Sequence, residues 1–364
     1  MNRLVVLLIA FFFINNCSLN ENSRIWKDKD KELSTKSNVK KIFEEKKIVV
    51  EEFNQILNLD LSGINTNNKF TSNQNDFGSQ SYRGELKKIG SYKFSKLEEL
   101  NQINFKPLFI ENDIVFFDKK GSIIRFNENQ KILWKKNYYT KSEKKLRPKL
   151  DFIFHEENIL VSDSVAKYYS INANTGELNW SKNNNYPFNS EIKKYKNKFF
   201  VIDYKNTLRC YKIEDGSECW NLPTEESFTI SNSKYSLIIL NDMVLFSNSI
   251  GDITAVDVDS GLIIWQLPTQ SISILNETYD FKTSKLVSDG NSIFFSNNKN
   301  EFYSIDIKTG TTNWISEINS NITPVITGNF IFTVSNEGYL HVIEKNKGNI
   351  IRVTDLFKIY KQKK

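Results

Sequence analysis

Histidine and cysteine are scarce in this chain of 364 residues, which contains two histidines and three cysteines. Neither His155 nor His341 has a second ligand at metal-binding spacing, and the run 155–158 lacks the second histidine of a helical zinc motif. No Gly-x-Ser-x-Gly elbow and no adjacent cysteine pair occur. We therefore expect no metal site and no catalytic residue, and we expect His341, inside an apolar run, to be a packed strand residue.

Apolar runs long enough to cross a membrane are also missing from the N-terminal region. The run Leu4 to Ile14 follows Arg3 and is too short for a transmembrane span, but it is typical of a secretory signal. Cys17 comes soon after it, which predicts a bacterial lipoprotein in which residues 1–16 are removed and Cys17 carries the lipid, palmitate included. An ordinary signal or an uncleaved anchor is the alternative.

Charge of one sign does not dominate, since 49 Lys and Arg face 43 Asp and Glu, for a net charge of +6. Residues 17–47 are polar and rich in Lys and Glu, which predicts a flexible tether that cannot bury a core. Residues 358–364 form a basic tail. The internal basic clusters, 135–136 and 141–149, are interpreted as solvated loops, and export argues against nucleic-acid binding.

A sustained helical period is absent from the central region, where a repeated phrase that ends in tryptophan occurs instead. The phrase is a short apolar run, a polar turn that usually ends in glycine, three residues and Trp. Successive copies lie 40 to 49 residues apart. The repeated residues are Trp134, Trp180, Trp220, Trp265 and Trp314, with Gly176, Gly216, Gly261 and Gly310 in the turns.

Strand-bearing repeats of this length are the signature of a β-propeller. In one copy the strands are expected at 243–246, 253–258 and 262–265, joined by turns that contain glycine. We predict an all-β propeller of about seven to eight four-stranded blades over residues 48–357, with the clearest repeats in 105–352. A sixth copy follows Gly338 but has Arg352 in the Trp position.

The Trp positions have a structural explanation, because a large flat ring on an outer strand can fill the gap between neighbouring blades. Ten residues before the Trp the side chain is mostly small, which would allow a ring or a neighbouring backbone to approach closely. Asp257 and Asp306 are interpreted as turn residues that accept backbone hydrogen bonds. The small residues are Ser170, Cys210, Ala255 and Ser304.

The pattern Ala255-x-Asp257, followed by Gly261 and Trp265, resembles the repeat of the pyrroloquinoline-quinone-like propellers. These include quinoprotein dehydrogenases and BamB-like outer-membrane assembly lipoproteins. The dehydrogenases are longer and carry a vicinal cysteine pair, a calcium site and a catalytic Asp, and this chain has no adjacent cysteines. The resemblance therefore implies a non-enzymatic protein without a cofactor; a quinoprotein-type dehydrogenase or a ligand-binding propeller is the alternative.

The BamB-like resemblance implies a scaffold on the periplasmic face of the outer membrane that binds the barrel subunit of the assembly machinery and contacts nascent barrel proteins. In such proteins inter-blade loops of the middle blades make the contact, through an alternating apolar run and acids. Phe228, Ile230 and Asp280 are the matching candidates, although Ser231 replaces an arginine and Lys282 replaces the second acid.

Cys210 and Cys219 flank the turn at Gly216. An oxidising periplasm would permit a disulfide between them, but the geometry depends on strand register. Cys210 also occupies the small-residue position, so the sequence leaves both a disulfide and two free thiols open.

Overall fold

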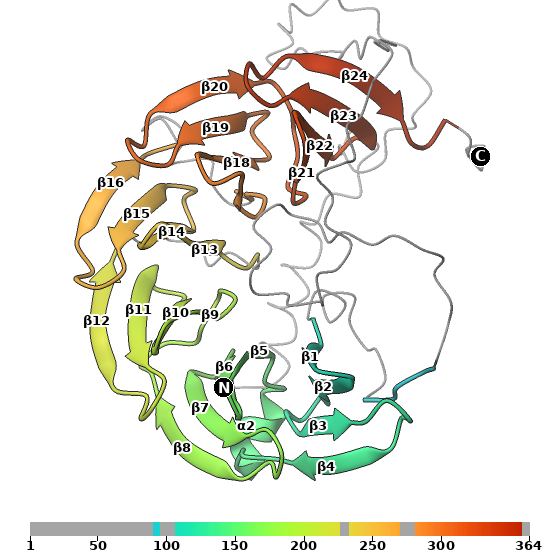
Figure 1. Cartoon of the computed structure of the whole chain (residues 1–364), viewed down its shortest axis with the longest axis vertical. Helices are drawn as coiled ribbons and strands as arrows, with labels where there is room; N and C mark the ends of the chain where they lie inside the picture. Colours follow the sequence, from blue (N-terminus) through green and yellow to red (C-terminus); the bar gives the residue numbers. More distant parts are fainter. Residues whose placement is uncertain (1–89, 95–105, 226–232, 270–280, 359–364) are drawn as a thin grey trace, which may run out of the picture. The chain divides into compact units, whose positions relative to one another are not determined.

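The computed structural model describes residues 90–94, 106–225, 233–269 and 281–358, all within the compact unit Val50–Lys364. These residues form six four-stranded antiparallel sheets, and in each sheet the strands follow one another in sequence order. Figure 1 shows the first strand of each sheet on the inner side and the fourth on the outer side. The fold is therefore the β-propeller that the repeat predicts.

The strands fall into four sets by their place in the sheet. The inner strands are β1 (Leu108–Ile110), β5 (Leu150–His155), β9 (Lys193–Tyr195), β13 (Leu237–Leu240), β17 (Val287–Ser288) and β21 (Val325–Thr327). The second strands are β2 (Asp113–Phe117), β6 (Asn158–Asp163), β10 (Lys198–Ile202), β14 (Met243–Ser247), β18 (Ser292–Ser296) and β22 (Phe330–Val334). The third strands are β3 (Ile123–Phe126), β7 (Lys167–Asn172), β11 (Thr207–Lys212), β15 (Ile253–Asp257), β19 (Phe302–Asp306) and β23 (Tyr339–Glu344). The outer strands are β4 (Ile132–Lys136), β8 (Leu178–Asn183), β12 (Glu218–Pro223), β16 (Ile263–Leu267), β20 (Thr312–Ser316) and β24 (Ile350–Asp355).

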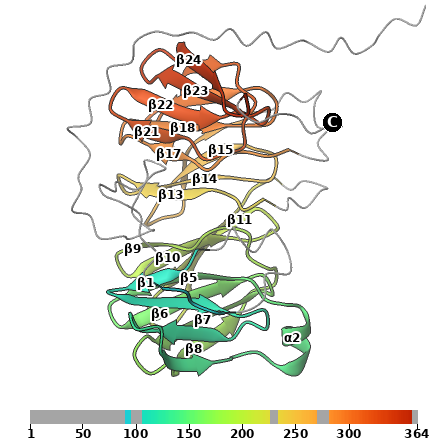
Figure 2. The same cartoon turned by 90° about the vertical axis from the view of Figure 1, so that its right-hand side faces the viewer.

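Because each sheet has an even number of antiparallel strands, the chain leaves a sheet at the end where it entered. The connections between consecutive sheets therefore lie on one face of the propeller, together with the turns between second and third strands. We call this face the inter-blade face. It carries the short helix α2 (Lys141–Lys145), between β4 and β5, at the ends of the strands in Figure 2.

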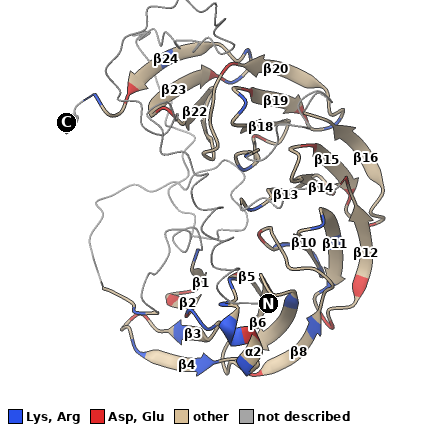
Figure 3. Ribbon diagram, turned by 180° about the vertical axis from the view of Figure 1, so that it is seen from behind, with Lys and Arg blue, Asp and Glu red and all other residues tan. Residues whose placement is uncertain are grey.

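Helix α2 was not expected from the sequence, where residues 141–149 read only as a basic cluster. Thr140 and Glu143 form a capping box, in which each side chain accepts a hydrogen bond from the other residue's backbone amide. This Thr-x-x-Glu signal stabilises the first turn and is readable in the sequence. The helix buries no residue, and Figure 3 shows its lysines among the basic positions of β4 and neighbouring sheets. The first five residues of the cluster are thus helical, and none of these five is buried.

The second strands β6, β10, β14 and β18 are buried on both faces, and successive residues along each strand pack into two different cores. In β6, Ile159 and Val161 pack with the first sheet, whereas Leu160 packs with the third. Such two-sided burial is why these strands read as continuous apolar runs. Five core clusters form in this way, each shared by two consecutive sheets. Each fully buried large side chain stabilises the fold by about 1.5–3 kcal/mol.

Each tryptophan of the repeat joins its own sheet to the next one, as the sequence predicted. The Trp265 indole N–H donates to the Ile307 carbonyl at 2.8 Å, and its ring lies against Gly310 in the turn of the following sheet. Trp134, Trp180, Trp220 and Trp314 repeat this contact against Gly176, Gly216, Gly261 and Gly348.

The other repeat assignments are confirmed as well. In four of the five copies the small residue ten positions before the Trp is its partner across the third and outer strands, as in Ser304 with Trp314, whereas Trp134 pairs with Arg125. Asp306 accepts backbone hydrogen bonds from Lys308 and Thr309 in its turn. Arg352 pairs with Val342, which is the position that Trp takes in the other sheets, and His341 is buried in β23.

A second repeated position lies on the inter-blade face and was not recognised in the sequence. The residue that begins the turn between second and third strands is Asp or Asn in five sheets, and its Oδ1 accepts backbone N–H groups two and four residues later. It therefore fixes the turn from within. The five residues are Asp118, Asp163, Asp203, Asn248 and Asn297.

Asp163 predicts a measurable pH dependence. Burial raises the pKa of Asp163 to about 6, in opposition to hydrogen bonds that include one of 2.6 Å from the Tyr139 hydroxyl. Since the folded protein holds this proton more tightly than the unfolded chain, the contribution to stability is largest below about pH 4 and is lost as pH rises through about 6. We expect wild type to lose up to about 3 kcal/mol relative to Asp163→Asn over that range. Urea unfolding at a series of pH values measures this difference, and a pH-independent difference would contradict the assignment.

Cys210 and Cys219 are free thiols in this structure. Cys210 pairs with Trp220 rather than with Cys219, because the register shifts by one residue between Cys210 and Tyr211 and Cys219 is the extra residue in β12. Most of the N-terminal predictions lie outside the described residues, which include only 90–94 of that region. These predictions are lipidation at Cys17, the segments 1–16 and 17–47, and the blade region 48–100. The predicted number of blades therefore stays a prediction.

Candidate interaction site

The predicted partner-binding residues Phe228, Ile230 and Asp280 lie outside the described residues, within the connections 226–232 and 270–280. The structure does describe the residues on either side of both connections. The connections join the third sheet to the fourth and the fourth to the fifth, and the described residues at their ends lie on the inter-blade face. The candidate site is therefore described from the residues at the two ends of each connection.

The first connection leaves β12 beside Asn206, a residue that the sequence analysis did not select. The Asn206 carbonyl accepts a 2.8 Å hydrogen bond from the Thr224 hydroxyl, and its side-chain amide donates to the Glu225 carbonyl at 2.7 Å. The same amide group donates to Ser249 in the fourth sheet, also at 2.7 Å. Asn206 is 1% exposed, so it joins two sheets and the start of the connection from a buried position.

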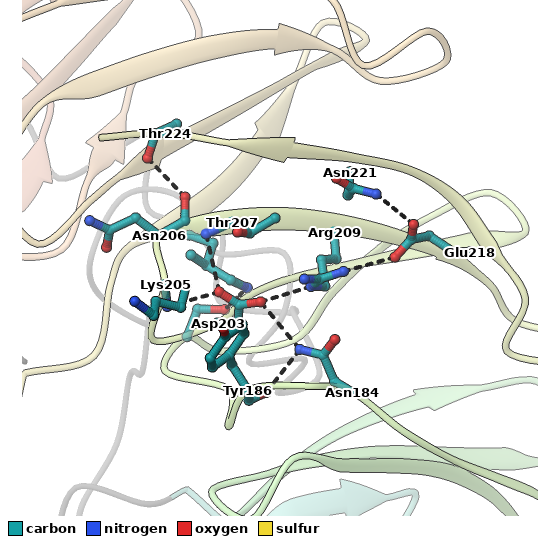
Figure 4. A network of polar contacts seen from close by, with 12 residues as sticks. Asn184, Tyr186, Asp203, Lys205, Asn206, Thr207, Arg209, Glu218, Asn221 and Thr224 are labelled. Atoms are coloured by element: carbon teal, nitrogen blue, oxygen red, sulfur yellow. Dashed lines mark hydrogen bonds and ion pairs between the residues drawn. The ribbon is translucent and has the colours of Figure 1, made fainter. Parts of the chain in front are cut away.

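Asp203 fixes the turn that carries Asn206 (Figure 4). Its Oδ1 accepts the amides of Lys205 and Thr207, and its Oδ2 pairs with Arg209 at 2.8 Å and accepts from Asn184 at 3.2 Å. The Asp203 side chain is 0% exposed. Because an unpaired buried carboxylate is costly, this set of partners holds the turn in one conformation.

Arg209 extends the network to the outer strand of the same sheet. Its Nη1 contacts a Glu218 carboxylate oxygen at 2.9 Å, and the other Glu218 oxygen accepts from Asn221 at 2.6 Å. The chain leading into the first connection is therefore supported from the turn at Asp203 to β12, as Figure 4 shows.

The far end of the first connection is also held. The Ser233 carbonyl accepts from the Asn189 side chain at 3.0 Å. The ammonium of the next residue, Lys234, contacts both carboxylate oxygens of Asp151 at 2.5 and 2.6 Å. The connection therefore begins and ends on fixed points of the second, third and fourth sheets.

The second connection begins and ends on one turn of the fourth sheet. The Thr269 hydroxyl donates to the Gly251 carbonyl at 3.0 Å, and the Thr269 amide donates to Asp252 at 3.3 Å. The Phe281 ring lies so close to Gly251 that a Cβ there would overlap it, and Gly251 has a φ of +88°. A glycine is required at this point because both the conformation and the close ring contact exclude a side chain.

The described residues at the ends of the two connections are held by hydrogen bonds to the turns and strands of the sheets. Within the described ranges, no group of three or more His, Cys, Asp or Glu side chains is placed to hold a metal ion. No helix in the same ranges is long and apolar enough to cross a membrane. The geometry therefore gives two connections whose described ends are fixed on the inter-blade face.

Comparison with known proteins gives a family and a fold. The sequence matches the family described as outer membrane protein assembly factor BamB over residues 119–354. BamB from Moraxella catarrhalis is similar in structure with a TM-score of 0.58 at 15% identity, covering 70% of this chain and 76% of that one. No curated protein matches the chain.

Two quinoprotein structures are similar at a lower level. A europium-containing methanol dehydrogenase has a TM-score of 0.48 at 10% identity and covers 57% of this chain and 50% of its own. Quinohemoprotein alcohol dehydrogenase ADHIIG from Pseudomonas putida HK5 has a TM-score of 0.43 at 12% identity, with 56% and 41% covered. At these TM-scores the similarity to the two dehydrogenases gives no information about the activity of this chain. The family match spans more than half of the sequence, and this chain therefore belongs to the BamB family of pyrroloquinoline-quinone-like repeat propellers.

Proposed function

We propose that this protein is a non-enzymatic scaffold of the β-barrel assembly machinery and that it binds the barrel subunit through the connections 226–232 and 270–280. The observation that carries the proposal is the fixed base of each connection, on Asn206 and Lys234 for the first and on the turn at Gly251 for the second. A loop with ordered ends loses less conformational entropy on binding, so more of the contact energy appears as affinity. Membership of the BamB family supports a role in outer-membrane protein assembly.

Within these connections Phe228 and Ile230 are the proposed apolar anchors, and Asp280 is the proposed charged contact. Apolar anchors at the centre of an interface carry most of the binding energy, whereas charges at the rim set orientation and association rate. The two connections leave neighbouring sheets on the same face, so one partner surface can contact both.

Nascent barrel proteins are the second proposed partner. Each outer strand has one edge without a partner in its own sheet, and such an edge can pair with an extended chain. Around β16, Leu262, Ile263 and Ile264 are 71%, 47% and 47% exposed, which provides apolar contact beside that edge. We propose that unfolded barrel strands align there transiently.

The proposed location is the periplasmic face of the outer membrane. Lipid on Cys17 would anchor the chain, residues 17–47 would act as a tether, and residues 48–357 would form the propeller, with 358–364 as a basic tail. A single acyl chain binds membranes only weakly, so stable anchoring requires the multiple acylation of a lipoprotein.

The test is co-purification of the detergent-solubilised full-length chain from its native envelope, with captured proteins identified by mass spectrometry. We expect recovery of the barrel subunit. In a direct binding assay, Phe228→Asp with Ile230→Asp should weaken the complex by at least about tenfold, and so should Asp280→Arg.

Ile315→Asp is the matched control, because Ile315 is an apolar residue 55% exposed on outer strand β20 and belongs to neither connection. It should bind as wild type does. If the barrel subunit is never captured, or if quinone or calcium copurifies in its place, the scaffold proposal fails. If the subunit is captured but the loop variants bind like the control, the connections are not the contact.

A further inference from the structure

Six charged side chains occupy the inner ends of the first five sheets, and the repeat accounts for none of them, although Lys234 and Asp151 also fix one end of the 226–232 connection. Four of them lie at one repeated position, five residues before the turn that follows the inner strand: Lys106, Asp151, Glu191 and Lys285. Lys193 and Lys234 lie within two residues of that position in their own sheets. All six are at the ends of the inner strands that belong to the inter-blade face.

The ion pairs among them show that they converge. Lys234 of the fourth sheet contacts Asp151 of the second sheet at 2.5 Å. Lys285 of the fifth sheet pairs with Glu191 of the third, and Lys193 lies 3.6 Å from the same carboxylate. Each of the two long-range pairs passes over an intervening sheet. In a propeller this is possible only near the central axis, where the inner strands of all blades meet.

Lys106 belongs to the same cluster although it has no ion pair or hydrogen bond to the described residues. Burial lowers the pKa of Lys106, Glu191 opposes that shift, and Lys285, Lys193 and Lys234 lower the pKa further. The ammonium group therefore lies within electrostatic range of the whole cluster. Its side chain is nevertheless exposed, so solvent reaches it.

The charges in this cluster do not balance. The cluster contains four lysines and two carboxylates, which leaves an excess of two positive charges among the six groups. Burial alone would raise the pKa of Glu191, but Lys285, Lys193 and Lys106 hold it well below the usual range. Asp151 differs, because burial raises its pKa in spite of Lys234. Lys106 is thus attracted by Glu191 but repelled by Lys285, Lys193 and Lys234, and the two carboxylates do not compensate all four lysines.

The cluster is also accessible to a small ligand. The side chains of Lys193, Lys234 and Lys285 are 11%, 22% and 38% exposed, and those of Asp151 and Glu191 are 20% and 26% exposed. A structural network would be expected to pair every lysine and to exclude water. Partial exposure with uncompensated positive charge instead suits an anion whose oxygens accept hydrogen bonds from several ammonium groups.

We propose that this axial cluster is a binding site for a small dianion that carries either a phosphoryl group or two carboxylates. Lys106 supplies the uncompensated contact, Lys193, Lys234 and Lys285 surround the anion, and Asp151 and Glu191 hold these lysines in place. Lys234 and Asp151 also fix one end of the 226–232 connection, but the anion contacts differ from the proposed partner contacts Phe228, Ile230 and Asp280, so separate variants and separate binding assays distinguish the two proposals.

The experiment is isothermal titration calorimetry of the full-length chain with inorganic phosphate and, separately, with succinate at matched ionic strength. We expect one site per chain for at least one of them, with a dissociation constant of about 1 mM or tighter. Binding of phosphate alone identifies a phosphoryl ligand, and binding of succinate identifies a dicarboxylate.

Two variants that change the net charge of the cluster in opposite directions test the electrostatic assignment. Lys106→Met removes a positive charge that has no described partner, and it should weaken binding by about tenfold. Asp151→Asn removes a negative charge and should tighten binding by at least about threefold. Lys347→Met is the control, because Lys347 is 70% exposed in the outer hairpin of the sixth sheet and should not alter binding.

The proposal is overturned if neither anion binds more tightly than about 10 mM. It is also overturned if Lys106→Met binds as tightly as Lys347→Met does. If a thermal melt shows that Asp151→Asn is not folded, the comparison of Lys106→Met with Lys347→Met still tests the proposal.

Discussion

We expect Gly310→Ala to lower the free energy of unfolding by about 3 kcal/mol, because it separates two neighbouring blades at their docking point. Gly310 has a φ of +71°, where a Cβ is strained, and that Cβ would lie 2.6 Å from Cδ2 of Trp265. The ring cannot retreat without loss of its 2.8 Å hydrogen bond to the Ile307 carbonyl. Denaturant unfolding of the variant and of wild type measures the difference.

Gly290→Ala is the matched control for backbone strain. Gly290 has a φ of +94°, but nothing lies within 4 Å of the position that a Cβ would take. The substitution should therefore cost only the positive-φ penalty, about 1 kcal/mol. The excess cost at Gly310 reports the Trp contact. Equal costs for the two variants would show that the tryptophan does not hold the blades together.

The repeat was predictable because each copy carries its own local signals. The turn that ends at Gly310 and the tryptophan at 314 have fixed spacing, and strands such as β14 and β15 appear within a residue or two of the predicted ranges. Helix α2 was missed because five residues give no periodicity, although the capping box of Thr140 and Glu143 is present. Local chemistry thus defines the elements wherever the repeat is intact.

The charged and polar sites could not be predicted in the same way. Asp151 and Lys234 are 83 residues apart, and only the closure of blades around an axis brings them together. A comparison of the copies by their first turn, rather than by Trp, would have revealed the shared position of Lys106, Asp151, Glu191 and Lys285. The Asp and Asn residues that open the second turn, such as Asp203, were similarly readable as a repeated position.

The second large effect is expected at Asp203, where substitution by alanine should lower the free energy of unfolding by about 3–5 kcal/mol. The change removes the acceptor of the Lys205 and Thr207 amides and leaves the Arg209 guanidinium, 13% exposed, without its closest carboxylate. Glu218 remains at 2.9 Å from Arg209 but is 37% exposed, so it compensates only in part. Denaturant unfolding gives the size of the loss.

Asp203→Asn separates the two roles of this carboxylate. Asparagine keeps the oxygen that accepts the two backbone amides, and Asn248 and Asn297 perform that role in the next two sheets. In those sheets the sixth residue after the Asn is Thr254 or Tyr303, whereas in the third sheet it is Arg209. We therefore expect Asp203→Asn to cost about 1–2 kcal/mol, which is the loss of the charged pair alone. If it costs as much as alanine, the charge on Asp203 and not its turn geometry holds the base of the 226–232 connection.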